Sequence, residues 1–212
     1  SNELLQYEKA ALGFYFSGHP LEQYQPELQQ FITAPLGQLD LGKSKTVLLA
    51  GLVVAVRSLF TKRGNRMAFI TLSDKSGRQE LAIFAELYEP NKAVLQKDAI
   101  IIVQAQGQYD AKSQSYKLSA ENIFTLTQAR QNWLKQIELQ LTTEAVSEEK
   151  LIQLKQLLGQ FSPGPCLIRI YYQSKTAAAY IDLGQYGWVR PEENLFAKLK
   201  IIVGEANMVL KY

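Results

Sequence analysis

Positive and aromatic side chains gather in one short segment near residue 60. Lys62, Arg63 and Arg66 place three cations within five positions, and Phe60 stands at the base of the same segment. Cations attract phosphate groups, and an aromatic ring offers a face on which a nucleobase can stack. The segment therefore indicates binding of a single-stranded nucleic acid.

The distribution of charge points to the same part of the chain. Residues 43–128 carry twelve basic and seven acidic side chains, a net charge of +5, whereas the parts before and after carry −4 and +2. A local excess of positive charge attracts an anionic partner even when the whole chain is only weakly basic. A second polar segment in this region contains Lys112 and is followed by Tyr116 and Lys117.

Alternation of apolar residues separates the faces of two neighbouring segments. Apolar residues alternate along residues 67–73 and face inward, which leaves Phe69 outside, and residues 78–84 turn Arg78 and Phe84 outward by the same rule. The alternative is that both aromatic rings pack beneath a neighbouring domain and that the cations are only solvent-exposed charges that keep a hairpin tip hydrated. The predicted nucleic-acid contacts are Arg57, Phe60, Lys62, Arg63, Arg66, Phe69, Arg78, Phe84, Lys112, Tyr116 and Lys117.

The chain has one histidine and one cysteine, which leaves little material for catalysis or metal binding. We expect His19, in a turn before Pro20, to have a structural role through a ring hydrogen bond. We expect Cys166, at the start of an apolar strand, to be a small buried side chain. Adjacent carboxylates fall in the first turns of two expected helices, where the helix dipole explains them. We therefore expect no catalytic residue, no metal site and no cofactor.

Five strands and one helical connection are expected between residues 46 and 124. Gly51 lies inside the long first strand, where a barrel strand would bend sharply. This order is that of the OB-fold, a five-stranded barrel that binds oligonucleotides with strands 2 and 3 and the loops 1–2 and 4–5. Another small barrel or sandwich is the alternative. The expected strands are residues 47–57, 67–73, 78–84, 99–109 and 116–124, with the helix or helical loop at residues 85–96.

The last third of the chain has a different pattern. Strands, helices and strands follow one another in the order β-α-β-β-α-β, which predicts a ferredoxin-like split βαβ sandwich. The expected elements are a strand at residues 135–141, a helix capped by Ser147, strands at residues 166–172 and 177–183, a helix at residues 191–203 and a strand at residues 207–212.

The sequence therefore predicts an α+β chain in three parts. These are a helical lead-in and linker at residues 1–42, an OB-fold nucleic-acid-binding domain at residues 43–128 and an α/β domain at residues 129–212. No apolar run approaches the roughly 18 residues that a membrane helix needs. The start lacks an initiator methionine and a signal-peptide pattern, and the single cysteine cannot form an internal disulfide. We expect a fragment of a longer cytoplasmic protein.

Several segments resemble one protein family closely. LGFYFSGHPL at residues 12–21, GLVVAVR at residues 51–57, FTKRGNRMA at residues 60–68 and LSDKSGRQE at residues 72–80 are similar to the carboxy-terminal region of the bacterial DNA polymerase III alpha subunit. The resemblance covers essentially the whole chain and is most specific through Phe84. It implies that the catalytic aspartates of the parent nucleotidyltransferase lie upstream of this segment, which would itself not be an enzyme.

The resemblance also implies partners in DNA replication. The OB domain would contact single-stranded template DNA and the rest of the polymerase, and residues 130–212 would bind the tau subunit of the clamp loader. The alternative is a purely protein–protein adaptor whose OB-fold does not bind DNA. QLDL at residues 38–41 starts like a clamp-binding peptide, but Gly42 stands where its aromatic anchor is expected, so we expect no sliding-clamp contact here. The candidate tau contacts are Tyr172, Tyr186, Trp188 and Phe196.

Overall fold

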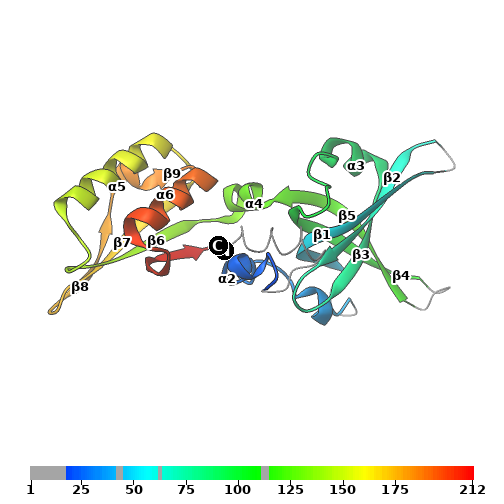
Figure 1. Ribbon diagram of the computed structural model, residues 1–212, viewed down its shortest axis with the longest axis horizontal. Helices are drawn as coiled ribbons and strands as arrows, with labels where there is room; N and C mark the ends of the chain where they lie inside the picture. Colours follow the sequence, from blue (N-terminus) through cyan, green and yellow to red (C-terminus); the bar gives the residue numbers. More distant parts are fainter. Residues whose placement is uncertain (1–17, 42–44, 62–63, 111–114) are drawn as a thin grey trace. The chain divides into compact units, whose positions relative to one another are not determined.

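A computed structural model describes residues 18–41, 45–61, 64–110 and 115–212 (Figure 1). The chain divides into two compact units, Ser1–Leu126 and Thr127–Tyr212, and each is described by itself. Residues 1–17 of the helical lead-in expected from the sequence lie outside the described residues. No helix within the described ranges is long and apolar enough to span a membrane.

The first unit is a closed five-stranded barrel preceded by short helical turns. Its strands follow one another around the barrel in the order β1-β2-β3-β5-β4. This arrangement confirms the predicted OB-fold, including the helix between the third and fourth strands. The elements are η1 (Glu22–Tyr24), α2 (Gln25–Leu28), η2 (Leu36–Gln38), β1 (Thr46–Phe60), β2 (Arg66–Ser73), β3 (Arg78–Ile83), α3 (Ala85–Asn91), β4 (Ile100–Asp110) and β5 (Ser115–Thr125).

The first strand belongs to both sides of the barrel. Its first half, from Thr46 to Leu52, pairs with β4, and its second half pairs with β2 as far as Phe60. Gly51 lies next to the change of partner, and a Cβ atom there would stand only 2.7 Å from Cβ of Leu72. Gly51, at which the sequence predicts a bend, therefore lies next to the point where the strand passes from one partner to the other.

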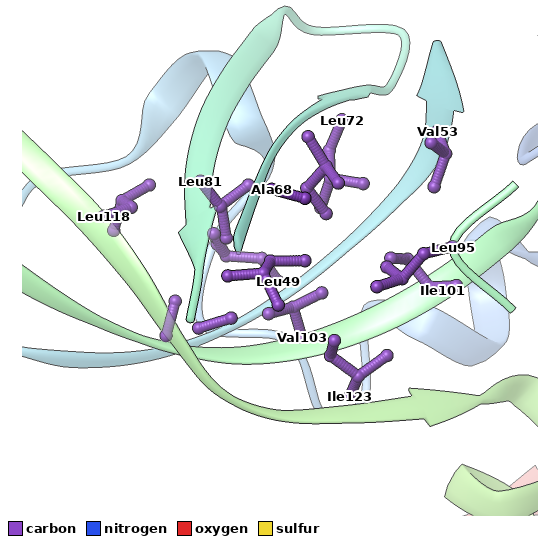
Figure 2. Close-up of a cluster of buried hydrophobic side chains, with 14 of the residues drawn as sticks. Leu49, Val53, Ala68, Leu72, Leu81, Leu95, Ile101, Val103, Leu118 and Ile123 are labelled. Carbon is purple, nitrogen blue, oxygen red and sulfur yellow. The ribbon is translucent and has the colours of Figure 1, made fainter. Parts of the chain in front are cut away.

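Alternating apolar residues fill the barrel (Figure 2). The side chains that point inward from β1, β2 and β3 are almost completely buried, as their alternation in the sequence predicts. Burial of a large apolar side chain contributes about 1.5–3 kcal/mol, so this cluster is the main source of stability of the first unit. Ten of its members are Leu49, Val53, Ala68, Leu72, Leu81, Leu95, Ile101, Val103, Leu118 and Ile123.

The turn between β2 and β3 holds the lead-in against the barrel. Asp74 Oδ1 accepts hydrogen bonds from the backbone N–H groups of Ser76 and Gly77 at 2.7 and 2.9 Å, and Asp74 Oδ2 accepts one from Leu36 at 2.8 Å. Burial alone would raise the pKa of Asp74, but these hydrogen bonds outweigh burial and lower it. Gly37 approaches the turn so closely that a Cβ atom would stand 2.2 Å from the carbonyl oxygen of Ser76.

His19 has the structural role expected for it. Its Nδ1 atom accepts a hydrogen bond from the backbone N–H of Leu21 at 3.2 Å. Burial lowers the pKa of the imidazole, although Asp74 and Glu22 act in the opposite direction. The ring borders a cavity of about 340 Å³ that the lead-in forms with the barrel.

The second unit is a sheet with two helices on one face. The strands stand in the order β10-β6-β7-β8, and β9 pairs with the start of β7. The elements are α4 (Leu126–Trp133), which begins at the last residue of the first unit, β6 (Gln136–Thr142), α5 (Glu148–Phe161), β7 (Cys166–Gln173), β8 (Ala178–Asp182), η3 (Gly184–Gly187), β9 (Trp188–Val189), α6 (Glu193–Val203), η4 (Glu205–Asn207) and β10 (Met208–Lys211).

This sheet differs from the ferredoxin-like arrangement that the sequence predicts. In a split βαβ unit another strand separates the two parallel strands. Here β6 and β7 pair directly and in parallel over the whole of β6, so the unit is not split. The expected order of strands and helices is present, with β9 and η3 added before α6, but the pairing of the strands is different.

Apolar side chains of β6, β7, α5 and α6 form one buried cluster. Both helices lie on the same face of the sheet (Figure 1). Ser147 caps α5, since its side chain accepts a hydrogen bond from the backbone N–H of Lys150. Cys166 is fully buried as expected, and burial raises the pKa of its thiol to about 12. A thiol in this state is protonated and inert at neutral pH.

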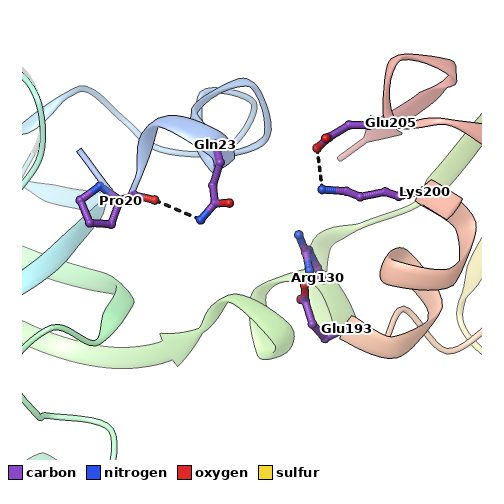
Figure 3. Close-up of polar contacts among 6 residues, drawn as sticks. All are labelled: Pro20, Gln23, Arg130, Glu193, Lys200 and Glu205. Atoms are coloured by element: carbon purple, nitrogen blue, oxygen red, sulfur yellow. Dashed lines mark hydrogen bonds and ion pairs between the residues drawn. The ribbon is translucent and has the colours of Figure 1, made fainter. Parts of the chain in front are cut away.

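One arginine is buried in the second unit (Figure 3). Arg130, on α4, is 4% exposed and places its Nη1 atom 2.5 Å from Oε2 of Glu193 at the start of α6. Its guanidinium also lies over the ring of Phe196, 4.1 Å from the ring centre. Phe196 is 1% exposed, so the prediction that it contacts a partner is wrong, because its ring belongs to the core.

Candidate nucleic-acid interface

One row of side chains runs around the outside of the barrel. Arg57 of β1 stands opposite Phe69 of β2, which stands opposite Ala82 of β3, and the row continues to Ser119 of β5 and Gln106 of β4. Directly opposite residues in neighbouring strands share a face. Because the neighbouring positions on β2 and β3 are buried, this row faces outward. Its middle part consists of the small residues Ala82 and Ser119.

A bulge in β1 turns Arg57 to the outside. The register between β1 and β2 shifts between Val53 and Ala55, where the pairing partners are Leu72 and Thr71. Val53 faces the core, and without the extra residue Arg57 would share that face, since side chains alternate along a strand. The guanidinium of Arg57 lies over the Phe69 ring, 5.1 Å from its centre. The bulge therefore brings together a cation and an aromatic ring that the sequence predicts as contacts.

Arg66 and Phe60 form a second pair on the other face of the strands. They stand opposite each other at the end of the β1–β2 ladder, on the face that Ser58 shares with the core residue Ala68. The Arg66 guanidinium lies 5.9 Å from the ring centre of Phe60 and 5.8 Å from that of Tyr88 on α3. Phe60 is 71% exposed. The structure thus divides the expected cluster between two faces of the hairpin.

The turn at the tip of this hairpin is described in part. Thr61 accepts a hydrogen bond from the backbone N–H of Gly64, and Gly64 has a φ of +79°, a conformation that glycine adopts without strain. Lys62 and Arg63 of the same turn lie outside the described residues, as does Lys112 of the β4–β5 turn. Their contacts with a nucleic acid remain predictions.

Two tyrosines face each other near the end of β4 and the start of β5. Tyr109 and Tyr116 are direct cross-strand partners, with ring centres 5.4 Å apart and an angle of 66° between the rings. Lys117 forms an ion pair with Asp110, so part of its charge is neutralised within the chain. The OB-fold placement of the loop between the fourth and fifth strands predicts Tyr116 and Lys117 as contacts. Tyr109 joins them through the register of the hairpin, which residue types alone do not reveal.

The other predicted contacts lie at the ends of β3. Arg78 is its exposed first residue, opposite Ser73, and Phe84 is the exposed residue just beyond its end. Phe84 accepts the backbone N–H of Tyr88 through its carbonyl oxygen, so its position is fixed by the start of α3. Arg78 and Phe84 therefore stand at opposite ends of the strand.

Three of the four aromatic residues predicted to bind a partner reach the surface of the second unit. Tyr186, on η3, and Trp188, on β9, are 51% and 45% exposed. Tyr172 is half-buried, and its hydroxyl lies 3.1 Å from Oγ1 of Thr143. Within the described ranges, no group of three or more His, Cys, Asp or Glu side chains could hold a metal ion.

Two protein-family models match the chain. Residues 47–126 match an OB-fold nucleic acid binding domain, and residues 153–204 match the C-terminal domain of DNA polymerase III subunit alpha. The first match coincides with the barrel, and the second covers most of α5, the strands β7 to β9 and α6. The second match names the family that the motifs resemble, and the first names the fold expected for the barrel.

Curated relatives cover almost the whole chain. DNA polymerase III subunit alpha of Haemophilus influenzae is 33% identical over 211 residues, and that of Escherichia coli K12 is 31% identical over 212 residues. The chain spans 18% of the length of each. Among solved structures, the mitochondrial single-stranded DNA binding protein Rim1 of Saccharomyces cerevisiae matches 38% of this chain and 92% of its own, with 16% identity and a TM-score of 0.31. The single-stranded DNA binding protein of Thermus aquaticus matches 38% of this chain and 49% of its own, with 21% identity and a TM-score of 0.32. By its curated relatives and its C-terminal family model, the chain is a relative of the C-terminal region of bacterial DNA polymerase III alpha subunits, and the resemblance inferred from the sequence is confirmed.

Proposed function

We propose that this chain is a non-catalytic segment of a replicative DNA polymerase and binds single-stranded template DNA through its barrel. The observation that carries the proposal is the pair of Arg57 and Phe69 on the outer face, beside the small residues Ala82 and Ser119. A cation and a ring supply phosphate attraction and a stacking surface. The match of residues 47–126 to a nucleic acid binding domain supports the same function.

In this proposal the nucleotidyl transfer of the parent enzyme takes place in another part of the polymerase. The segment itself then needs neither a metal nor a cofactor, and it contacts the remainder of the polymerase chain. We expect the segment to function in the cytoplasm, because a free thiol such as that of Cys166 is stable under reducing conditions.

Titration of fluorescently labelled oligo-dT with the full 212-residue chain tests the proposal. We expect binding at low salt that weakens steeply as salt is added, because each neutralised phosphate releases counterions. The double variant Arg57→Ala/Phe69→Ala should lose about tenfold or more in affinity, the equivalent of one lost stacking contact. Lys97→Ala, which removes a charge from an exposed position after α3, is the control and should bind like the wild type. Equal affinities of the double variant and the wild type would reject this face as the site.

We infer further that the second unit binds the tau subunit of the clamp loader. The resemblance to the polymerase family and the match of residues 153–204 to its C-terminal domain support this partner. Tyr186 and Trp188 are exposed aromatic residues of the kind that dominate protein interfaces. In a calorimetric titration with tau, Trp188→Ala should cost about 2 kcal/mol or more. The exposed Ile201 of α6 provides the control variant Ile201→Ala, and equal losses in the two variants would contradict a specific role of Trp188.

A second candidate function is that of a protein adaptor whose barrel does not bind DNA. The ion pair of Lys117 with Asp110 favours it, because the carboxylate neutralises a positive charge that would otherwise attract phosphate. The adaptor function requires that oligo-dT does not bind even at low salt while tau still binds.

A further inference from the structure

The edge strand β8 (Ala178–Asp182) is open to a partner. Among the described residues no strand pairs with its outer side, and all five of its residues are exposed. The opposite edge, β10, is different, because its first three residues are partly buried and Lys211 at its end bonds to the carboxylate of Glu138. Edge strands are commonly protected by charge, proline or a bulge. Residues 178–181 contain none of these.

The direction of the backbone groups follows from the turn before β8. The backbone N–H of Ser174 bonds to the carbonyl oxygen of Ala177 at 2.8 Å, which marks these two residues as a hydrogen-bonded pair. Hydrogen-bonded and non-hydrogen-bonded pairs alternate along an antiparallel ladder, and the register of β7 with β8 is continuous. Ala178, Tyr180 and Asp182 therefore direct their N–H and C=O groups away from β7.

The side chains of β8 offer a contact on each face of the sheet. Tyr180 is exposed on the face that the helices leave open, where its ring lies 5.1 Å from that of Tyr171 and under the guanidinium of Arg169. Ile181 is exposed on the helix side, and the exposed Ala179 lies on the same face two residues before it. An added strand would thus find an aromatic surface on one face and an aliphatic surface on the other.

We propose that the protein partner of the second unit adds an extended segment to β8 as a further strand of the sheet. This inference rests on the proposed function, in which that partner is tau. The segment would pair its backbone with the outward groups of Ala178, Tyr180 and Asp182 and place an apolar side chain beside Ile181. An extended backbone is the ligand that offers donors and acceptors at this spacing.

Another copy of the chain is the less suitable occupant of this edge. Pairing of two β8 strands would join only five residues from each copy. Stable interfaces usually bury about 1,200–2,000 Å² in total, which takes about 20–30 residues per partner. A flexible partner segment can continue beyond β8 toward β9, which pairs with the start of β7, and reach the exposed Tyr186 and Trp188. The continuation adds the aromatic contacts that a short strand pair lacks.

Amide hydrogen exchange measured by NMR on the full chain tests the inference directly. In the free protein the amides of Ala178, Tyr180 and Asp182 should exchange fast, while those of Ala179 and Ile181, which bond to β7, should be protected. With saturating tau, exchange of the three outward amides should slow by at least tenfold. If they still exchange fast in the complex, the inference is wrong while tau binding stands.

A pair of variants at one position separates the backbone from the side chain. Tyr180→Pro removes an outward N–H that the sheet does not use, and Tyr180→Ala removes the ring but keeps that N–H. We expect Tyr180→Pro to bind tau at least tenfold more weakly than Tyr180→Ala. Thermal unfolding and oligo-dT binding check that both variants are folded, and if the proline variant is not, the exchange experiment decides alone.

Two further results would also overturn the inference. If the wild type does not bind tau, the proposed partner is rejected, and the added strand is rejected with it. If the outward amides are protected in the free chain and sedimentation gives the mass of a dimer, the occupant is a second copy. Equal tau affinities of the two Tyr180 variants would show that backbone pairing does not contribute.

Discussion

The guanidinium of Arg57 and the ring of Phe69 face each other across β1 and β2, with 5.1 Å between the guanidinium carbon and the ring centre. A cation–π contact of this kind contributes about 0.5–1 kcal/mol at an exposed site. The contact also holds the cation at one place on the outer face. The two side chains should therefore act together when a nucleic acid binds.

A double-mutant cycle for oligo-dT binding measures this coupling. Arg57→Ala should reduce the slope of log affinity against log salt concentration by about one, the value of one phosphate contact. Arg57→Lys should keep that slope but bind more weakly, because an ammonium group lacks the planar stacking of guanidinium. We expect the loss of binding free energy in the double variant to differ from the sum of the losses in Arg57→Ala and Phe69→Ala by about 0.5 kcal/mol or more. Strict additivity would contradict the coupling.

Glycine-to-alanine substitutions at two positions should change stability in opposite directions. At Gly37 a Cβ atom would stand 2.2 Å from the backbone carbonyl oxygen of Ser76, so Gly37→Ala must move the lead-in or the β2–β3 turn. We expect a loss of about 1–3 kcal/mol in the unfolding free energy of the first unit. Gly159, inside α5, has open space around it, and Gly159→Ala should stabilise the second unit by about 0.5–1 kcal/mol. Urea unfolding measures both, and a neutral Gly37→Ala would contradict the close approach.

The stability of the first unit should depend on pH through His19. Burial lowers the pKa of its imidazole in the folded state, against the effects of Asp74 and Glu22. The unfolded chain therefore binds more protons at pH values just below 6.5, so the contribution of His19 is complete above that pH and is lost as the pH falls through the lower, folded-state pKa. Urea unfolding near pH 7.5 and near pH 5 measures this loss, within the range in which His titrates.

The variant His19→Asn provides the control for this pH dependence. Its amide oxygen can accept the N–H of Leu21 but does not titrate, so the fall in stability between the two pH values should be smaller than in the wild type. Carboxylates away from position 19 titrate equally in both proteins, whereas Glu22 loses the contribution of His19 to its lowered pKa. An identical fall in the two proteins would show that His19 is not the group responsible.

Cys166 should react with thiol reagents only when the second unit opens. The residue is fully buried and its thiol has a pKa of about 12, so thiolate is scarce in the folded state at pH 8. We expect slow labelling by a disulfide reagent in buffer and fast, stoichiometric labelling in urea. Fast labelling without denaturant would mean that the strand β7 opens locally.

The barrel could be predicted from the sequence because its signal is local. Alternation along residues 67–73 and 78–84 identifies the buried face without knowledge of any partner strand. The direction of Arg57 could not be predicted in this way, since the bulge between Val53 and Ala55 reverses the alternation and leaves no clear mark in the residue types. The register that places Arg66 opposite Phe60 depends equally on the hairpin turn.

The second unit illustrates a limit of another kind. The order of strands and helices along the chain leaves open which strands pair, and β6 and β7 pair directly instead of being separated. Phe196 and Trp188 are both aromatic residues of this unit, yet the first lies beneath Arg130 and the second is exposed. Burial of this kind is decided by contacts between distant elements, which single residue types do not encode. The helix α4 also escaped prediction, because its eight residues, LTQARQNW, are mostly polar and are typical of a connecting segment.

The barrel is closed along β3 and β5 by two parallel pairs, Leu81 with Leu118 and Ala82 with Ser119. This seam is the shortest junction between neighbouring barrel strands in the described part of the chain. Thermal breathing of the cylinder should therefore start there. Ala82 and Ser119 also belong to the outward row. A polynucleotide bound over them would therefore contact β3 and β5 at the same time. Binding of the polynucleotide would then stabilise the closed barrel, and this stabilisation would be lost when the polynucleotide dissociates.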